Sequence, residues 1–167
     1  AGIAVIYQEL ALIGAMTVAE NVFLGVEPRR GALIDWHKMY ADTRELLHDY
    51  DLTLDPTARV ADLGVGQQQL VEIVKALAKN SKILLLDEPT AGMTLDEVES
   101  TAALIRDINH SYSMIVVEHD MKFIRMIAET VTVFHQGKIL AEDHVDAILR
   151  DAAVRDVYLG KQADRDA

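Results

Sequence analysis

Two adjacent carboxylates, Asp87 and Glu88, close an apolar run in the segment KILLLDEPT at residues 82–90. The run at 83–86 is apolar at every position, which predicts a strand buried on both faces of a parallel sheet. Pro89 prevents the strand from continuing. Because open α/β sheets bind their ligands at the carboxyl ends of the strands, the acidic pair is predicted to lie in a ligand site.

Metal-assisted hydrolysis of a phosphate is a reaction that needs two neighbouring carboxylates. One carboxylate holds Mg²⁺, usually through water, and the other orients or deprotonates the attacking water. An apolar run that ends in Asp87 and Glu88 is also typical of a strand that simply ends in an acidic turn. The pair alone does not decide between the two interpretations.

Two further apolar runs end in polar side chains. Residues 3–7 (IAVIY) predict a buried strand that stops at Gln8, and residues 114–117 (MIVV) predict another that stops just before His119. A glutamine in this place can bind a metal or a water, and an imidazole can donate to a phosphate oxygen or orient water. Each is by itself more often an ordinary loop residue, so position at a strand end is what makes it a candidate.

A glycine-containing segment, LGVGQ at residues 63–67, precedes a predicted helix. Glycines at a helix start let backbone N–H groups approach a ligand, and the helix dipole favours an anion there. The segment predicts a phosphate contact, although a lone GxG before a helix is more often an ordinary loop. The apolar stripe of the helix consists of Leu70, Ile73, Val74 and Leu77.

Residues 17–79 predict helices and no strand, and so a helical insertion between two strands of the sheet. Thr17 and Glu20 form a capping box that opens a short helix ending near residue 24. Asp35 caps a longer helix. Its predicted core positions are Trp36, Met39, Tyr40, Thr43, Leu47 and Tyr50.

After the central strand, a second capping box at Thr94 and Glu97 opens a helix that runs to about residue 109. The Gln136-Gly137 turn predicts a hairpin of the segments around it. The remaining predicted elements are a helix at 121–128, the hairpin strands at 131–134 and 138–141, and short helices at 145–150 and 152–159.

Composition limits the class of protein. With 50% hydrophobic and 26% charged residues in 167, the chain is predicted to be globular, and no apolar run reaches the length of a membrane span. A net charge of −11 argues against binding to nucleic acid. The chain has no cysteine, which excludes disulfides and thiolate metal sites. We therefore expect a cytoplasmic protein.

Four separated segments occur in an order that resembles the nucleotide-binding domain of ABC transporters. Gln8 corresponds to the Q-loop, LGVGQ at 63–67 to the signature loop, ILLLDE at 83–88 to Walker B with its following glutamate, and His119 to the H-loop. Residues 91–94 (AGMT) correspond to the D-loop. The resemblance implies an α/β fold of the P-loop NTPase (RecA-like) type, a parallel sheet with a helical subdomain, here lacking the Walker A strand and loop.

The resemblance also implies ATP and Mg²⁺ as cofactors, with hydrolysis at the interface of a head-to-tail dimer formed with a second ATP-binding domain. Asp87 then supports Mg²⁺, Glu88 polarises the attacking water, Gln8 senses the metal, and His119 contacts the γ-phosphate. The residues implied to face the partner's nucleotide are Gly64, Val65, Gly66 and Gln67. The helical insertion is implied to dock on membrane permease subunits, which places the protein at the inner face of the cell membrane.

The same resemblance predicts the domain organisation. Residues 1–160 form the carboxyl-terminal part of one ABC ATPase domain, and 161–167 form a polar tail. Within this part, 1–9 and 80–160 are the sheet core and 10–79 the helical subdomain. Loss of a strand between those at 114–117 and 131–134 is expected to leave an exposed edge that favours self-association.

Two departures from the family pattern lead us to expect that the chain alone is inactive. The phosphate-binding sequence GxxxxGK[ST] does not occur, so we expect a domain truncated before the Q-loop. Gly64 stands where the family has serine, which removes a hydroxyl donor worth roughly 1.5–3 kcal/mol. The alternative is a degenerate, non-catalytic partner domain that contributes the signature face and permease docking.

The resemblance divides along the chain over the transported solute. Residues 5–25 and 65–77 are similar to sugar-import ATPases. Four later segments, at 89–94, 116–124, 135–143 and 154–160, are similar to the ATPases of branched-chain amino-acid or urea importers. ABC-type ATPases of chromosome maintenance or translation are disfavoured, because they bring long coiled coils or a basic linker and this acidic chain has neither.

Overall fold

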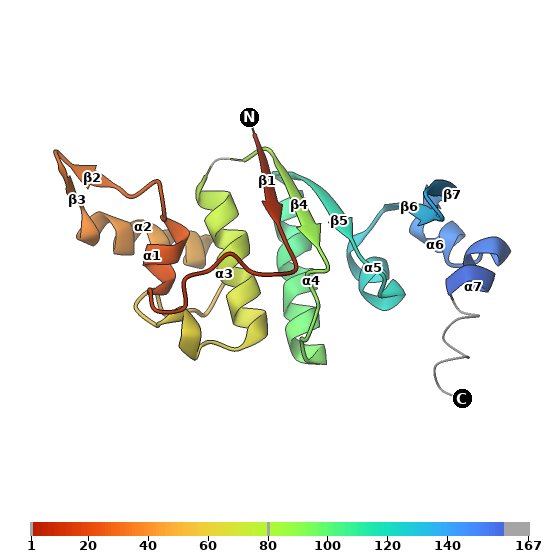
Figure 1. Cartoon of the computed structure of the whole chain (residues 1–167), viewed down its shortest axis with the longest axis horizontal. Coiled ribbons are helices and arrows are strands. Elements are labelled where there is room, and N and C mark those ends of the chain that lie inside the picture. The colour runs from red at the N-terminus through yellow and green to blue at the C-terminus, as the bar shows by residue number, and fades with distance from the viewer. Residues whose placement is uncertain (1, 80, 159–167) are drawn as a thin grey trace. The chain divides into compact units, whose positions relative to one another are not determined.

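The computed structural model describes residues 2–79 and 81–158. The chain forms two compact units that divide between Glu118 and His119. The first unit contains β1 (Ile3–Ile6), α1 (Val18–Val22), β2 (Arg29–Arg30), β3 (Leu33–Ile34), α2 (Trp36–Asp49), a 3-10 turn η1 (Val60–Asp62), α3 (Val65–Ala78), β4 (Ile83–Asp87), α4 (Leu95–Asn109) and β5 (Ser113–Val117) (Figure 1). The second contains α5 (Met121–Ile127), β6 (Thr130–His135), β7 (Lys138–His144), α6 (Val145–Ile148) and α7 (Ala152–Tyr158).

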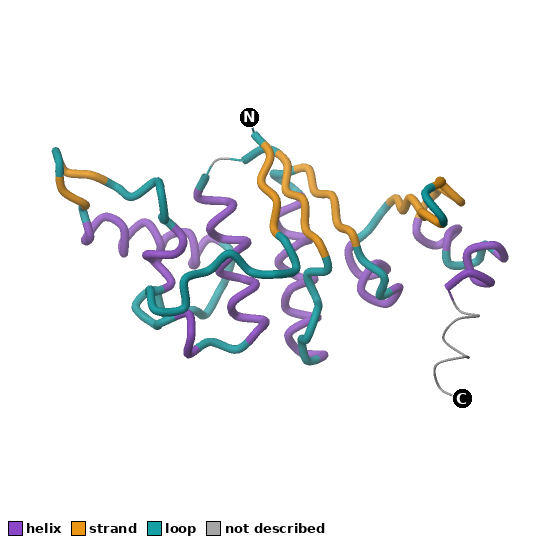
Figure 2. The backbone as a smooth tube through the Cα atoms, in the orientation of Figure 1, coloured by secondary structure: helices purple, strands orange, loops and turns teal. Residues whose placement is uncertain are grey.

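A parallel sheet of three strands, in the order β1-β4-β5, forms the centre of the first unit. Figure 2 shows the three strands side by side, and β4 pairs in parallel with both of its neighbours. The predicted central position of the strand that carries Asp87 is confirmed. Helix α3 packs against β1 and against α4, so the helices form a layer on the sheet.

The sheet has one covered face and one open face. Leu84 and Leu86 of β4 are completely buried, and Ile6 of β1 is nearly so. The alternate positions point to the other side, where Val5 is 42% and Ile115 is 54% exposed. The prediction of buried strands is therefore wrong for this face of β1 and β5, and β4, predicted to be buried on both faces, is only partly buried here. Successive side chains of a strand point to opposite faces, and within the described residues a helical layer covers only one of them.

The helical part of the first unit has its own core, built where α1, α2 and α3 meet. Its buried residues are Val18, Ala19, Val22, Phe23, Met39, Leu47, Val60, Val71 and Val74. The capping box of Thr17 and Glu20 is confirmed, and Asp35 caps α2 by accepting from the backbone N–H of Lys38 at 3.0 Å. Trp36, predicted to be a core residue, is 50% exposed, because it occupies the first turn of α2 beyond the edge of this core.

A short hairpin interrupts the segment that was predicted to contain no strand. Arg29 pairs with Ile34 and Arg30 with Leu33 in an antiparallel ladder. Gly31 lies in the turn with φ 68°, a backbone region that suits glycine. Two residues on each side are too few to produce a recognisable alternation in the sequence, which is why the prediction of a purely helical insertion is wrong here.

The second unit is built on the predicted hairpin, which is confirmed. β6 and β7 pair through a turn in which Gln136 and Gly137 both have positive φ, the geometry that matches the twist of a two-residue hairpin loop. Its small core is formed by Val133, Ile148 and Val154. The predicted helices over 121–128, 145–150 and 152–159 appear as α5, α6 and α7, while the predicted tail at 161–167 lies outside the described residues.

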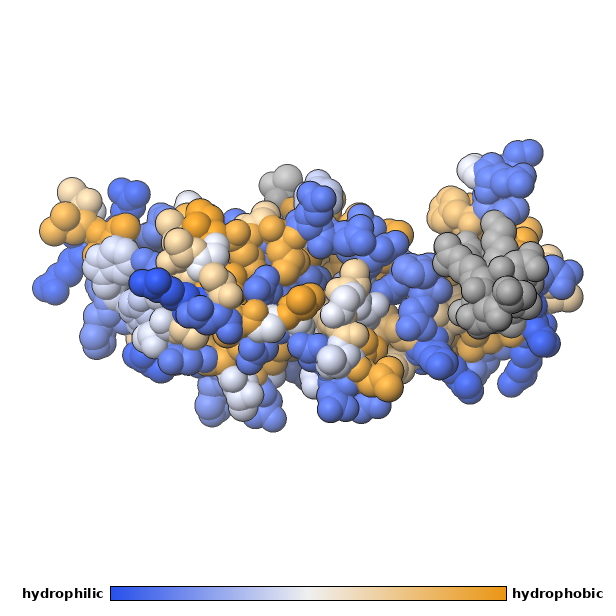
Figure 3. Space-filling view, turned by 60° about the horizontal axis from the view of Figure 1, so that its bottom comes forward, coloured by the Kyte–Doolittle hydropathy of each residue, from blue (hydrophilic) through white to orange (hydrophobic). Residues whose placement is uncertain are grey.

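The surface mixes hydrophobic and hydrophilic residues on the face shown in Figure 3. Large apolar side chains are exposed on helices and loops as well as on the sheet, among them Leu33 and Leu95. Within the first unit, β5 is the last strand of its sheet and pairs only with β4. None of the helices in residues 2–79 and 81–158 combines the length and apolarity needed to cross a membrane.

Candidate functional site

The carboxyl edge of the parallel sheet gathers the polar residues that follow its strands. The last paired positions are Ile6 with Leu86 and Asp87 with Val117. Because β1 and β4 are parallel and in register, Gln8 and Glu88 each follow the last β1–β4 pair by two residues at the same edge. The structure thus brings Gln8, Asp87 and Glu88 to one side of one sheet, as the sequence predicts.

Glu88 has an unusual backbone conformation. Its φ is 45°, in the left-handed region that non-glycine residues rarely adopt, and such strain is concentrated at functional sites. Its N–H donates to the carbonyl oxygen of Val117 at 2.9 Å, and its own carbonyl accepts from the N–H of Ala91 at 3.2 Å. The neighbouring strand and the following turn therefore hold Glu88 directly after the end of β4.

A side-chain bond joins the two loops that follow β4 and β5. The hydroxyl of Thr90 donates to the carboxylate of Glu118, and both residues are partly buried. Sequence reasoning gave neither residue a role. Glu118 precedes the candidate His119, so proximity in the sequence was a signal for it, whereas nothing in the sequence singled out Thr90.

His119 begins the second unit and is exposed. The next residue, Asp120, caps α5: its side chain accepts from the N–H of Lys122 at 2.8 Å and from that of Phe123 at 3.4 Å. The strand predicted at 114–117 is present as β5, which ends two residues before His119. Its contact with a γ-phosphate stays a prediction.

The glycine-containing segment forms the start of α3, as predicted, with Gly64 in the N-cap position. The N–H of Gly64 donates to Gln67 Oε1 at 3.2 Å. Gly64, Val65 and Gln67 are exposed, whereas Gly66 is buried. In Figure 1, α3 begins at the lower end of the view, toward which β1 and β4 also point. A face of exposed residues is thus available at this helix start.

An anion of the chain itself contacts this helix start. Glu97 Oε1 accepts from the N–H of Gly66 at 3.2 Å, and Oε2 accepts from the N–H and the hydroxyl of Thr94, each at 2.9 Å. The bonds from Thr94, and more weakly that from Gly66, hold the pKa of Glu97 below its ordinary value. The predicted phosphate position is therefore next to a carboxylate that sequence reasoning identified only as part of a capping box.

Gly66 allows this contact because it has no side chain. A Cβ at this position would lie 2.7 Å from Glu97 Oε1 and 2.8 Å from its Cγ, closer than real Cβ atoms approach their neighbours. At Gly64 a Cβ would lie 3.5 Å from Glu97 Oε1, an ordinary contact. Of the two glycines, Gly66 is the one at which a Cβ would force the Glu97 side chain to move.

A cleft of about 290 Å³ lies between the loop after α2 and the first turns of α3 and α4. Its charged lining residues are Asp51, Asp96 and Glu97, and the lining residues include no Lys, Arg or His. The cleft therefore has the wrong charge for a phosphate group.

The donors at the carboxyl edge of the sheet were tested against Mg²⁺. Gln8 and Asp87 offer oxygen ligands only. No group of three or more His, Cys, Asp or Glu that could hold a metal occurs in residues 2–79 and 81–158. Mg²⁺ keeps several of its waters and is bound by one or two carboxylates together with substrate phosphates. The donor set fits that ion and does not provide an all-protein cage.

Comparison with known proteins finds relatives that are all named as ATP-binding proteins of sugar import. The chain is 42% identical to a xylose import ATP-binding protein of Moorella thermoacetica over 99% of this chain and 33% of that protein. It is 41% identical to the xylose import ATP-binding protein of Geobacillus kaustophilus over 92% of this chain and 31% of that protein. It is 44% identical to a ribose import ATP-binding protein of Streptomyces avermitilis over 84% of this chain and 27% of that protein.

The chain thus spans about a third or less of the length of these relatives. All three are named for sugar import, and the alignments extend through both halves of the chain. The expected similarity of the second half to amino-acid or urea importers is not supported by them.

Solved structures show the same fold. An ATP-binding cassette of an ABC transporter in its ADP conformation superposes with a TM-score of 0.76 at 23% identity, over 95% of this chain and 68% of that chain. A cassette in a dimeric post-hydrolysis state with ADP and Pi gives 0.69 at 27% identity, over 86% and 62%. The family model described as ABC transporter matches residues 1–91, more than half of the chain. The chain therefore belongs to the ABC transporter family, with the fold of its ATP-binding domains.

Proposed function

We propose that this chain is part of the ATP-hydrolysing subunit of an importer that takes up a sugar. The observation that carries the proposal is the position of Asp87 and Glu88 at the end of the central strand, with Glu88 held in the left-handed region by Val117. The choice of a sugar is supported by relatives that are named for xylose and ribose import.

Each candidate residue has a role in this proposal. Asp87 and Gln8 hold Mg²⁺, which supplies charge neutralisation at the phosphates when it is bound. Glu88 orients and deprotonates the attacking water. His119 donates to the γ-phosphate. Gly64, Val65, Gly66 and Gln67 face the nucleotide of a second ATP-binding domain in a head-to-tail dimer.

The proposed partners follow from the same assignment. The helical part at residues 10–79 docks on permease subunits, and the protein lies on the cytoplasmic side of the membrane. Nucleic acid is not a proposed partner, because a net charge of −11 repels a polyanion.

A second candidate function is a non-catalytic partner domain that supplies the signature face to an intact domain. Two observations favour it. The sequence has glycine at position 64, where the family pattern has serine, so one hydroxyl donor to a phosphate is missing. At the start of α3 the N–H of Gly66 is already bonded to Glu97, which leaves one backbone donor fewer for an incoming phosphate.

ATP hydrolysis by the chain, alone and mixed with an intact ATP-binding domain of a sugar importer, tests both functions. The catalytic proposal expects the turnover that the chain adds to that of the intact domain to fall by roughly a hundredfold or more in Glu88→Gln and to be unchanged in the control Glu99→Gln, an exposed carboxylate on α4. Added turnover that survives Glu88→Gln would contradict the catalytic proposal. The partner-domain proposal instead expects the chain to stimulate the intact domain regardless of Glu88→Gln, and Val65→Glu to abolish the stimulation.

A further inference from the structure

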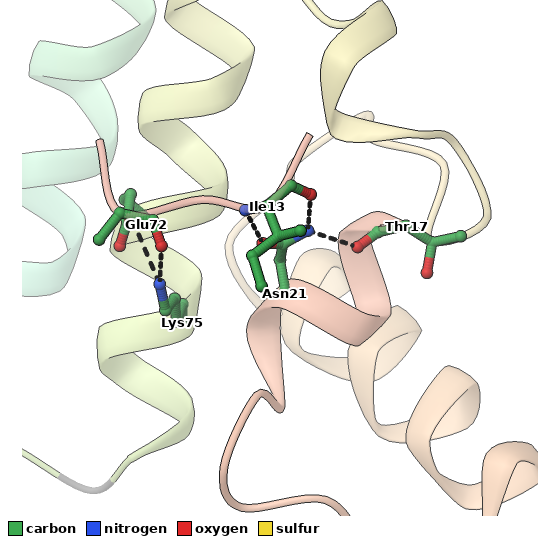
Figure 4. A network of polar contacts seen from close by, with 6 residues as sticks. Ile13, Thr17, Asn21, Glu72 and Lys75 are labelled. Carbon is green, nitrogen blue, oxygen red and sulfur yellow. Dashed lines mark hydrogen bonds and ion pairs between the residues drawn. The ribbon is translucent and has the colours of Figure 1, made fainter. Parts of the chain in front are cut away.

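Helix α3 carries an ion pair inside an apolar environment. Glu72 and Lys75 are only 7% and 8% exposed, and Lys75 Nζ lies 3.3 Å from Glu72 Oε1. The same ammonium group donates to the backbone carbonyl oxygen of Ala11 at 2.7 Å. Figure 4 shows Lys75 and Glu72 side by side on the helix, with the strand-to-helix connection passing close to them.

The burial of this pair is not explained by stability. Taking two charges out of water costs about as much as their attraction returns, and well-packed apolar residues often replace such a pair without loss. One turn earlier on the same helix, the side-chain nitrogen of Gln69 is buried without a hydrogen-bond partner, which is itself unfavourable. Burying these polar side chains on one face of α3 therefore costs free energy of folding. What the ion pair provides in return is a fixed contact with the Ala11 carbonyl.

Ala11 belongs to the irregular segment that connects β1 to α1. The side chains of Ala11 and Ile13 are exposed, whereas Leu12 between them packs against the helical core, so the backbone of this stretch is held by one apolar side chain and by polar contacts. Ala11 lies three residues after Gln8, which is within about 11 Å along an extended chain. A contact that fixes the Ala11 carbonyl therefore limits where Gln8 can lie at the sheet edge.

A second polar anchor holds the same segment from the side of α1. Asn21 is completely buried, and its Oδ1 accepts from the N–H of Ile13 at 2.8 Å. Its Nδ2 donates to the carbonyl oxygens of Ile13 at 3.1 Å and Thr17 at 3.0 Å. Figure 4 shows Asn21 between these two backbone groups. The segment is thus bonded through its backbone to two different helices.

We propose that Glu72 and Lys75 are a positioning pair for Gln8. Glu72 orients the Lys75 ammonium, Lys75 holds the carbonyl of Ala11, and with the Asn21 anchor this fixes the path of the segment that begins with Gln8. The role assigned to Gln8 rests on the proposed function, whereas the anchoring of the segment does not.

Amide hydrogen exchange tests the anchoring without any activity. Lys75→Met removes the ammonium and keeps the length of the side chain. With only the Asn21 anchor left, the segment should open more often, so exchange of the Ile13 amide is expected to become roughly tenfold faster. Lys75→Arg restores a charged donor and should restore the protection. Lys79→Met, which removes an exposed lysine at the end of the same helix, is the matched control and should change nothing.

The double variant Glu72→Met/Lys75→Met separates positioning from stability. Lys75→Met alone leaves Glu72 buried without its partner and should unfold at a lower urea concentration. The double variant removes both buried charges, so it should unfold at the same urea concentration as the unchanged protein, while exchange of the Ile13 amide stays fast. Unchanged Ile13 exchange in this double variant would overturn the proposal, because the pair would then be replaceable packing.

The Mg²⁺ dependence of turnover, measured in the mixed assembly, tests the link to Gln8. Lys75→Met and Gln8→Ala should each raise the Mg²⁺ concentration for half-maximal rate, and combining them should add nothing further. If Lys75→Met speeds exchange of the Ile13 amide but leaves the Mg²⁺ concentration for half-maximal rate unchanged, the positioning role is overturned. Failure of the proposed function shows itself separately, as turnover that is insensitive to Glu88→Gln.

Discussion

The backbone N–H of Glu88 donates to the carbonyl oxygen of Val117 at 2.9 Å, which ties the residue after β4 to the last residue of β5. Glu88 has a φ of 45°, and a non-glycine residue in the left-handed region costs on the order of 1–3 kcal/mol unless its surroundings impose it. The adjacent strand supplies that constraint. The place of the Glu88 backbone is thus set by the sheet and not by its own conformational preference.

The variant with glycine at position 88 should be more stable than the variant with alanine there. Both substitutions remove the side chain, but only glycine adopts a positive φ without strain, so Glu88→Gly should unfold with a free energy about 1 kcal/mol higher than Glu88→Ala. Urea unfolding of the two variants measures the difference. Gln136, with φ 49° in the hairpin turn of the second unit, is the matched control and should show the same order. An alanine variant at 88 as stable as the glycine variant would show that the backbone there is unstrained.

Neighbouring leucines of β4 should differ in their contribution to stability. Leu84 is completely buried against the helices, so Leu84→Ala should reduce the free energy of unfolding by about 2–5 kcal/mol. Leu85 points to the open face and is only partly buried, so Leu85→Ala should cost about half as much. Denaturant titration checks both. Equal losses would mean that a further layer covers the second face.

The two glycines at the start of α3 should respond differently to alanine. Gly66→Ala places a Cβ against the Glu97 side chain and should cost about 1–3 kcal/mol. Gly64→Ala, with an ordinary contact and a φ of −65°, should change stability by less than about 0.5 kcal/mol. Combining Gly66→Ala with Glu97→Ala should cost less than the sum of the two single changes. Strict additivity would show that Glu97 is not what excludes a side chain at 66.

Acid should weaken the fold partly through Glu97. Its pKa in the folded protein is lowered below the ordinary 4.5, mainly by the bonds from Thr94. Above pH 4.5 the carboxylate is ionised in both states and its stabilisation is fully present; as the pH falls from there through the folded pKa, the unfolded state takes up the proton first and the stabilisation is lost. Between pH 6 and lower pH, the free energy of unfolding should therefore decline less in Glu97→Gln than in the unchanged protein.

The control for this measurement is Glu99→Gln, an exposed carboxylate two residues along α4. Asp55 and Glu27 also have a lowered pKa, from hydrogen bonds with Thr57 and Gly25 respectively, and keep contributing to the acid response in either variant. Identical declines for the unchanged protein and Glu97→Gln would show that the contact with Gly66 and Thr94 does not stabilise the fold.

Local signals allowed much of the fold to be predicted. Thr17 with Glu20, Thr94 with Glu97 and the Gln136-Gly137 turn each act within a few residues, and the structure has a helix start or a hairpin at each. The shared sheet edge of Gln8 and Glu88 was also predictable, since parallel strands place their carboxyl ends together.

What the sequence did not reveal depends on tertiary contacts. The apolar run of β4 conceals which face is covered, because both faces of the strand carry leucine or isoleucine. Trp36 has the helical spacing of a core residue and still lies beyond the core that it would join. Lys75 looks like a solvent-facing charge until the Ala11 carbonyl, 64 positions earlier, is seen beside it.

The Asn21 side chain uses both of its N–H bonds and its carbonyl oxygen on backbone groups of Ile13 and Thr17. Aspartate has the acceptor but neither donor, and leucine has the size without any polar atom, so each would leave buried main-chain groups unsatisfied. The connection between β1 and α1 is therefore held by a side chain whose two isosteres, aspartate and leucine, cannot make the same three hydrogen bonds. Position 21 should resist evolutionary drift more strongly than the exposed residues around it.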